Sequence, residues 1–179
     1  MKIISALRQS VYGWIMILRN EAGWQERFRL TMPGLATGLV LFYLFAFLAV
    51  VLASLEMGVP TLQGLFDIML IQSIWLLALV VGIYGTRFAL REDVPVLPLL
   101  VPGIYALIYY LILGTLISLI LGMLLPLLWV GLGWLLFCLG RRAGNWTLGV
   151  AAAFAVLTVV LLVGTPLTLY MLTAPVSAA

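Results

Sequence analysis

The chain has 179 residues, of which 65% are hydrophobic and 8% charged, and its formal net charge is +3. Soluble domains are about 45–50% apolar and about 25% charged, and a small domain in water leaves much of its surface exposed, so the composition excludes a water-soluble fold. The nine Lys and Arg residues are spread over several short segments, so they do not indicate nucleic-acid binding.

Residues 1–30 form the first predicted unit, a basic amphipathic segment on the cytoplasmic side. Arg8 interrupts its apolar run, whereas a signal peptide needs an unbroken apolar core of about 7–15 residues, so we expect this segment to be retained. Trp24 lies at its margin. The pattern is typical of a helix in the membrane interface; the alternative is a helix that packs on the membrane domain or on a partner. The apolar residues that recur at helical spacing are Ile3, Leu7, Val11, Trp14 or Ile15, and Leu18.

Residues 31–179 form the second predicted unit, a five-helix transmembrane domain. A helix needs about 20 apolar residues to cross about 30 Å of hydrocarbon. Two runs, near 33–55 and 65–88, satisfy this. The uncharged stretch 94–140 is too long for one span, and we divide it at Gly122 and Pro126, because glycine ends helices and proline begins them. This gives spans near 99–121 and 125–140, and a fifth near 146–173. Open strand edges are not tolerated in lipid, which excludes strands.

The basic residues predict the orientation of these spans. They lie before the first span, in the connection between the second and third spans (Arg87, Arg91), or in the connection between the fourth and fifth spans (Arg141, Arg142). In a five-span arrangement all nine then lie on one side. Because cytoplasmic loops are enriched in Lys and Arg, we predict a cytoplasmic N-terminus and an external C-terminus.

Residues that carry chemistry are scarce. The chain has no histidine and one cysteine, Cys138, and it contains no glycine-rich phosphate-binding motif. This excludes histidine-ligated haem, most zinc sites and histidine general bases. We therefore predict no catalytic residue, no cofactor and no metal site, and no enzymatic activity.

Asp67 is the one acidic residue that the spans place inside the membrane. An ionisable residue there is a functional hypothesis by default, such as a proton or cation site. Asp67 also lies within about one turn of the outer boundary, where it can reach interfacial water. A transport pathway would draw on a small set of polar residues: Asp67, Gln72, Ser73, Tyr109 and Thr115.

Small residues at intervals of four mark two helix faces that permit close packing. Gly34 and Gly38 lie at the start of the first span. Gly114, Ser118 and Gly122 form a longer small-residue face along the third span. Packing within the protein and contact with another membrane-protein subunit or a second copy are both compatible with this spacing.

The order of features resembles the Yip1-domain family of small membrane proteins. The residues that carry the resemblance are 20–26, which include Trp24 and precede Pro33, the turn 121–126, and the closing span from Trp146. The resemblance implies a cytoplasmic N-terminal segment, five spans and no catalytic residues. It also implies a role in membrane organisation, in trafficking in eukaryotes, or in association with other membrane proteins. We expect the chain to lie in the bacterial inner membrane.

The sequence therefore predicts a non-enzymatic membrane-organising protein or accessory subunit of a larger membrane complex. Its predicted partners are the lipid bilayer and other membrane-protein subunits or further copies of itself, not nucleic acid. The alternative is a transporter or channel component with a polar site near Asp67.

Overall fold

The computed structural model describes residues 2–58, 60–91, 93, 95–121 and 124–173, and these form helices without strands. The elements are α1 (Lys2–Leu18), the 3-10 helix η1 (Trp24–Arg27), α2 (Met32–Met57), α3 (Leu62–Leu90), α4 (Leu97–Leu121), α5 (Leu125–Ala143) and α6 (Leu148–Thr173). Five of them, α2 to α6, are long and apolar enough to cross a membrane. The prediction of an all-helical chain with five helices long and apolar enough to span a membrane is thus confirmed, and the helix ends differ by a few residues from the predicted spans.

Local capping explains where two of these spans begin. The Thr31 hydroxyl accepts a hydrogen bond from the Gly34 N–H at 3.3 Å, and Pro33 occupies the first turn of α2. The Thr61 hydroxyl caps α3 in the same way, at 3.1 Å from the Gly64 N–H. A threonine cap satisfies one N–H group that a helix leaves open, and proline suits the first turn because its missing N–H is not needed there.

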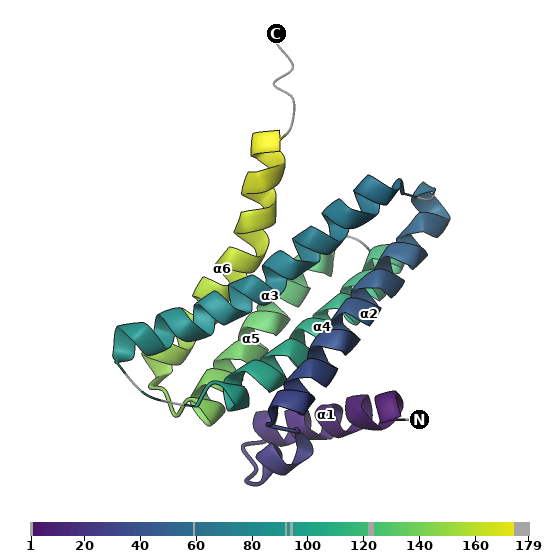
Figure 1. Ribbon diagram of the computed structural model, residues 1–179. Helices are drawn as coiled ribbons and strands as arrows, with labels where there is room; N and C mark the ends of the chain where they lie inside the picture. The colour runs from purple at the N-terminus through teal and green to yellow at the C-terminus, as the bar shows by residue number, and fades with distance from the viewer. Residues whose placement is uncertain (1, 59, 92, 94, 122–123, 174–179) are drawn as a thin grey trace.

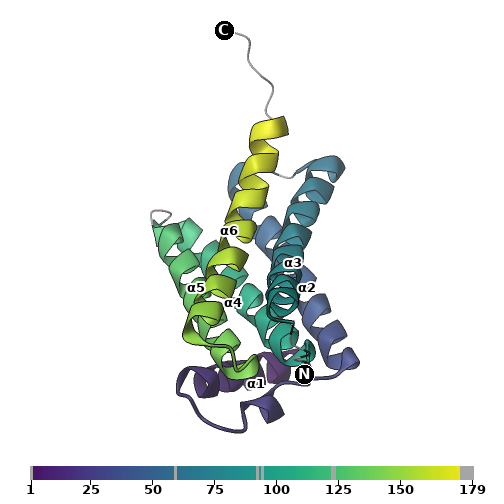
Figure 2. The same ribbon diagram turned by 90° about the vertical axis from the view of Figure 1, so that its left-hand side faces the viewer.

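The five long helices run side by side, and α1 lies across one end of them (Figures 1 and 2). We call this the α1 end and the opposite one the far end. The helices alternate in direction, so the last part of α6 emerges at the far end and stands clear of the others. Helix α4 is central, because it contacts α2, α3, α5 and α1.

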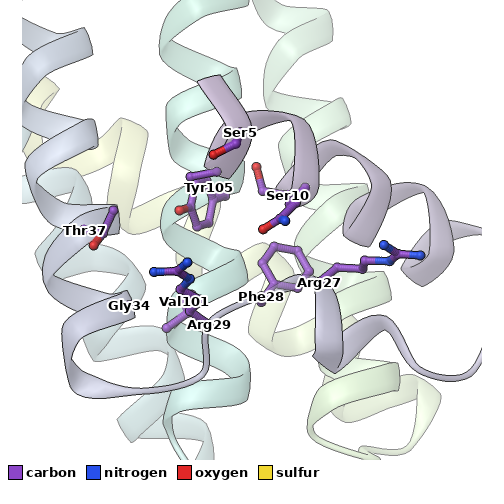
Figure 3. Close-up of a pocket in the computed structure, with 11 residues that line it drawn as sticks. Ser5, Ser10, Arg27, Phe28, Arg29, Gly34, Thr37, Val101 and Tyr105 are labelled. Carbon is purple, nitrogen blue, oxygen red and sulfur yellow. The ribbon is translucent and has the colours of Figure 1, made fainter. Parts of the chain in front are cut away.

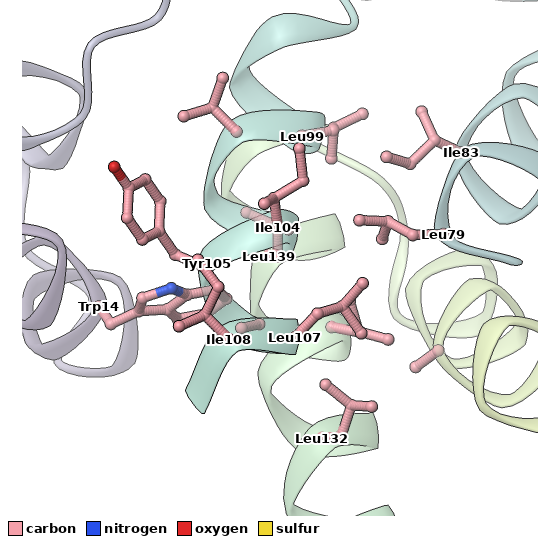
Figure 4. Packing of buried hydrophobic residues seen from close by; sticks show 14 of the residues in the cluster. Trp14, Leu79, Ile83, Leu99, Ile104, Tyr105, Leu107, Ile108, Leu132 and Leu139 are labelled. Carbon is pink, nitrogen blue, oxygen red and sulfur yellow. The ribbon is translucent and has the colours of Figure 1, made fainter. Parts of the chain in front are cut away.

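The core forms around the first half of α4 (Figure 4). Half of the residues in the hydrophobic stretch of α4 are buried (50%), against 22–28% in the other four spans. A helix that is apolar all round is expected where neighbours surround it. The four outer helices instead leave most of their apolar residues open to their surroundings, which indicates contact with a lipid bilayer. Fully buried core residues include Leu79, Ile83, Leu99, Ile104, Leu107, Leu136, Leu139 and Phe154.

Candidate functional site at the α1 end of the bundle

Helix α1 is fixed to the bundle by one of its faces. Trp14 and Ile17 are 4% and 2% exposed and belong to the same core cluster as α4 and α5. The Ser10 hydroxyl donates to the Leu7 carbonyl at 2.8 Å and shares a hydrogen bond with the Tyr109 hydroxyl of α4, which also lies 3.4 Å from the Leu7 carbonyl oxygen. The predicted apolar stripe is therefore divided between two surroundings. Part of it packs inward, and part of it remains exposed on the side of α1.

The chain after α1 folds back under it. Gly23 adopts the left-handed conformation (φ 81°) that precedes η1, and the rings of Trp24 and Phe28 are both buried. Phe28 packs between Trp24, which it meets edge to face, and Tyr105 of α4, to which its ring is tilted, with ring centroids 6.1 and 6.0 Å apart. A side chain at Gly13 would clash with the Phe28 ring, so glycine there allows η1 and α1 to approach closely. The α1–η1 unit is thus a packed cap on the bundle.

A cavity of about 260 Å³ lies between this cap and the membrane helices (Figure 3). The Arg29 side chain extends between Thr37 and the Tyr105 hydroxyl, whereas Arg27 extends away from them. Gly34 is essential to this geometry, because a Cβ atom there would overlap the Arg29 carbonyl oxygen. The polar lining consists of Ser5, Gln9, Ser10, Arg27, Arg29, Thr37 and Tyr105, with no acidic residue.

Positive charge gathers at the α1 end as the sequence predicted. The arginines lie on α1, on the connection to α2, and at the ends of α3 and α5. Arg141 donates to the Trp146 carbonyl at 2.8 Å, and the Arg87 guanidinium lies 5.8 Å from the Tyr84 ring centroid. Within the described residues no arginine forms an ion pair. The end is therefore a basic surface, and Glu21, Glu26 and Asp93 at the same end offset only part of its charge.

The polar residues considered for a transport pathway lie apart in the structure. Asp67 is exposed, Ser73 hydrogen bonds to Tyr43 of α2 at 2.9 Å, and the Tyr109 hydroxyl faces α1. Gln72 and Thr115 do line one cavity, between α2, α3 and α4. The cavity does not include Asp67, so these residues do not form one continuous polar path.

The predicted small-residue faces also take different positions. Gly34 contacts the segment before α2, and Gly38 is buried where α2 meets α4, with its Cβ position 3.5 Å from Ile104 Cγ2. Gly114 and Ser118 line the cavity between α2, α3 and α4. Gly122 lies outside the described residues. These positions show packing within the protein at Gly34 and Gly38 and an open space beside Gly114 and Ser118.

Sequence reasoning did not find the cavity under α1. Arg29 and Tyr105 are 76 positions apart in the sequence (105 − 29), and no spacing rule links them. The available signal was local: Arg29 precedes the Thr31 cap by two residues, which predicts a charge at the start of α2. That α4 brings a tyrosine to this charge follows only from the tertiary arrangement.

Among the described residues, no group of three or more His, Cys, Asp or Glu side chains is placed to hold a metal ion. No protein-family model, curated protein or solved structure matches the chain. The resemblance to the Yip1-domain family therefore rests on the order of the helices and on the short segments that carry it.

Proposed function

We propose that this chain is a non-enzymatic membrane-organising protein, acting as an accessory subunit of a larger complex in the bacterial inner membrane. In this proposal the α1 end faces the cytoplasm, the C-terminus lies outside, and the α1–η1 cap sits at the membrane interface. The observation that carries the proposal is the packed, basic cap over the α1 end. The layout shared with the Yip1-domain family agrees with it.

The faces of α1 support an interfacial position. At about 100° per residue, the buried residues of α1, Ser10, Trp14 and Ile17, occupy one side of the helix. An apolar strip that stays exposed lies beside them, and Arg8 and Arg19 come next around the helix. An amphipathic helix in the interface has this order, with apolar side chains toward lipid and basic ones toward headgroups. The exposed apolar strip consists of Ile4, Val11, Ile15 and Leu18.

The cavity beneath α1 suits the phosphate of an anionic phospholipid headgroup. Arg29 supplies a guanidinium, and Tyr105 and Gln9 supply groups that can donate hydrogen bonds. Because no acidic residue lines the cavity, an anion meets no repulsion from its walls. A lipid held at this point would tie the cap to the surface of the membrane.

The free part of α6 supports contact with another membrane protein. Its last turns stand clear of the other helices at the far end (Figures 1 and 2). Leu167 and Met171 are exposed there, and in a membrane an isolated apolar helix end can be covered by a partner helix as well as by lipid. A transport role has less support, since Asp67 does not share a cavity with Gln72 and Thr115.

Lipid retention tests the headgroup part of the proposal. Native mass spectrometry of protein released from bilayers of phosphatidylglycerol and phosphatidylethanolamine should show retained phosphatidylglycerol. A basic residue near an anionic surface contributes about 1 kcal/mol, so Arg29→Gln should weaken this retention roughly fivefold. Arg19→Gln is the matched control, because Arg19 is also exposed but does not line the cavity. Equal losses in both variants would mean that only the overall charge of the cap matters.

Purification from native membranes tests the accessory role. Protein extracted without denaturation at its native expression level should migrate with a defined partner or as an oligomer. A stable lone monomer would contradict the accessory role without affecting the lipid measurement.

A further inference from the structure

A second cavity, of about 500 Å³, lies between α2, α3 and α4 in the half of the bundle away from α1. Gly58 and Pro60, in the connection between α2 and α3, line its outer end, and Trp75 and Tyr110 line it further inside. It thus extends from the far end into the hydrocarbon-spanning part of the helices. Its volume lies within the range of about 300–1,000 Å³ that is usual for small-molecule sites.

The hydrogen-bonding groups of this cavity are incompletely satisfied. The Gln72 side-chain oxygen is enclosed, yet it has no hydrogen-bond partner among the described residues. A buried acceptor without a partner is costly. The Tyr110 hydroxyl accepts a hydrogen bond from Trp129 Nε1 at 2.9 Å, so its own proton is free for another acceptor. Thr115 donates to the Leu111 carbonyl at 2.8 Å, which leaves its oxygen as an acceptor.

The rest of the lining is uncharged and mostly apolar; the exceptions are Ser54 and Ser118, whose hydroxyls donate to the Val50 and Thr115 carbonyls. Val50, Ala53 and Ile68 form its wall, and no Asp, Glu, Lys or Arg takes part. The site therefore does not suit an ion or a charged headgroup. Water alone is also a poor occupant of so large a space, because an ordered water needs roughly two to four polar partners and this wall offers few.

We propose that this cavity binds an uncharged long-chain amphiphile with a hydroxyl head. The hydroxyl would donate to the Gln72 oxygen and accept from the Tyr110 hydroxyl. The edge-to-face pair of Trp75 and Tyr110, with ring centroids 5.1 Å apart, would border the head. The hydrocarbon chain would lie along the apolar wall beside Ala53. This binding is independent of the proposed role of the cap at the α1 end.

The test compares three probes with one hydrocarbon chain and different heads. In nanodiscs of the full chain, radiolabelled 1-monooleoylglycerol should bind saturably, and methyl oleate, which lacks a hydroxyl, should bind at least tenfold more weakly. Oleate should also bind weakly at neutral pH because it brings a charge into an uncharged site. Gln72→Leu should lower the affinity for 1-monooleoylglycerol roughly tenfold, the effect of losing one good hydrogen bond.

Two further variants make the outcome decisive. Gln63→Leu applies the same change to an exposed position of α3 outside the cavity, and it should leave binding unchanged. Ala53→Phe fills the cavity without altering Gln72, and it should abolish saturable binding while circular dichroism and thermal unfolding remain normal. Equal binding of 1-monooleoylglycerol and methyl oleate would overturn the proposal. Undiminished binding in Ala53→Phe, or equal effects of Gln72→Leu and Gln63→Leu, would do the same.

Discussion

At the scale of single residues, one glycine decides how closely α3 and α6 approach. A Cβ atom at Gly82 would overlap the Thr158 hydroxyl oxygen and lie 3.3 Å from Phe154 Cε2. Thr158 is fully buried, and its hydroxyl has no hydrogen-bond partner among the described residues. Gly85, one turn further along α3, has nothing within 4 Å of its Cβ position. The two glycines thus differ in packing although they share a helix.

We expect Gly82→Ala to lower the stability of the bundle. Overpacking a tight core costs about 1–3 kcal/mol, which outweighs the gain of up to about 1 kcal/mol in helix propensity. Gly85→Ala should gain from propensity without a clash, so it should unfold at the same or a higher temperature. Thermal unfolding in one detergent, followed by circular dichroism, measures the difference.

A double variant separates the clash from other effects. Thr158→Ala removes the atom that Gly82→Ala would meet, so the two changes together should recover part of the stability lost in Gly82→Ala alone. Strictly additive losses would show that the Gly82–Thr158 contact does not limit the approach of α3 to α6.

The spacing of small residues in the sequence predicted close packing at glycines other than Gly82, and the reason is physical. Small residues at intervals of four mark a face on which a neighbour can come close, but they do not say which neighbour is present. Gly114 and Ser118 have this spacing and line a cavity. Gly103 lacks a small residue at that spacing, whereas Gly82 has Ala78 and Thr86 four positions away on either side. Both glycines lie at close contacts, Gly103 with Leu79 Cδ2 at 2.9 Å from its Cβ position. The arrangement of helices decides this, and it depends on residues far apart in the chain.

At the scale of elements, the long helices could be predicted almost completely. Runs of about 20 apolar residues, threonine caps and prolines in first turns are local signals, and the helices follow them. The faces of α1 were harder to predict, since its apolar residues cover more than one side. Its buried face depends on Tyr109 and on the aromatic rings of Trp24 and Phe28, which no periodicity within residues 2–18 can reveal.

Replacing Trp14 should release α1 from the bundle. Trp14 is 4% exposed and Val11 is 42% exposed. Truncating a buried tryptophan costs about 3–5 kcal/mol, so Trp14→Ala should increase amide exchange over residues 2–18 and their sensitivity to protease. Val11→Ala is the matched control and should change exchange little in detergent.

The same pair of variants distinguishes packing from lipid attachment. If α1 also lies in the interface, Val11→Ala should raise exchange in nanodiscs more than in detergent, although less than Trp14→Ala. An equal effect of both variants in nanodiscs would show that lipid contact, rather than the Trp14 contact, holds the helix.

At the scale of the whole molecule, an odd number of spans and the distribution of arginines point to one arrangement in the membrane. Helix α3 has 29 residues, and at about 1.5 Å per residue it is about 43 Å long. This exceeds the hydrocarbon thickness of about 30 Å, so Thr61 and Arg91, which flank α3, should both lie outside the hydrocarbon. The basic end should then be cytoplasmic because positive loops are retained on that side.

Cysteine labelling should place these two positions on opposite sides of the membrane. The experiment begins from Cys138→Ala, because Cys138 is the one natural cysteine. In intact cells a membrane-impermeant maleimide should modify Thr61→Cys, whereas Arg91→Cys and Arg142→Cys should react only after the membrane is opened. Arg142 is the independent check, since α5 brings it to the same end as Arg91 through a different pair of helices.

Labelling of Thr61→Cys and Arg91→Cys from one side would contradict five spans in the membrane. Labelling of Arg91→Cys and Arg142→Cys from outside, with Thr61→Cys protected, would keep the five spans and reverse their orientation, so the cap would then face away from the cytoplasm.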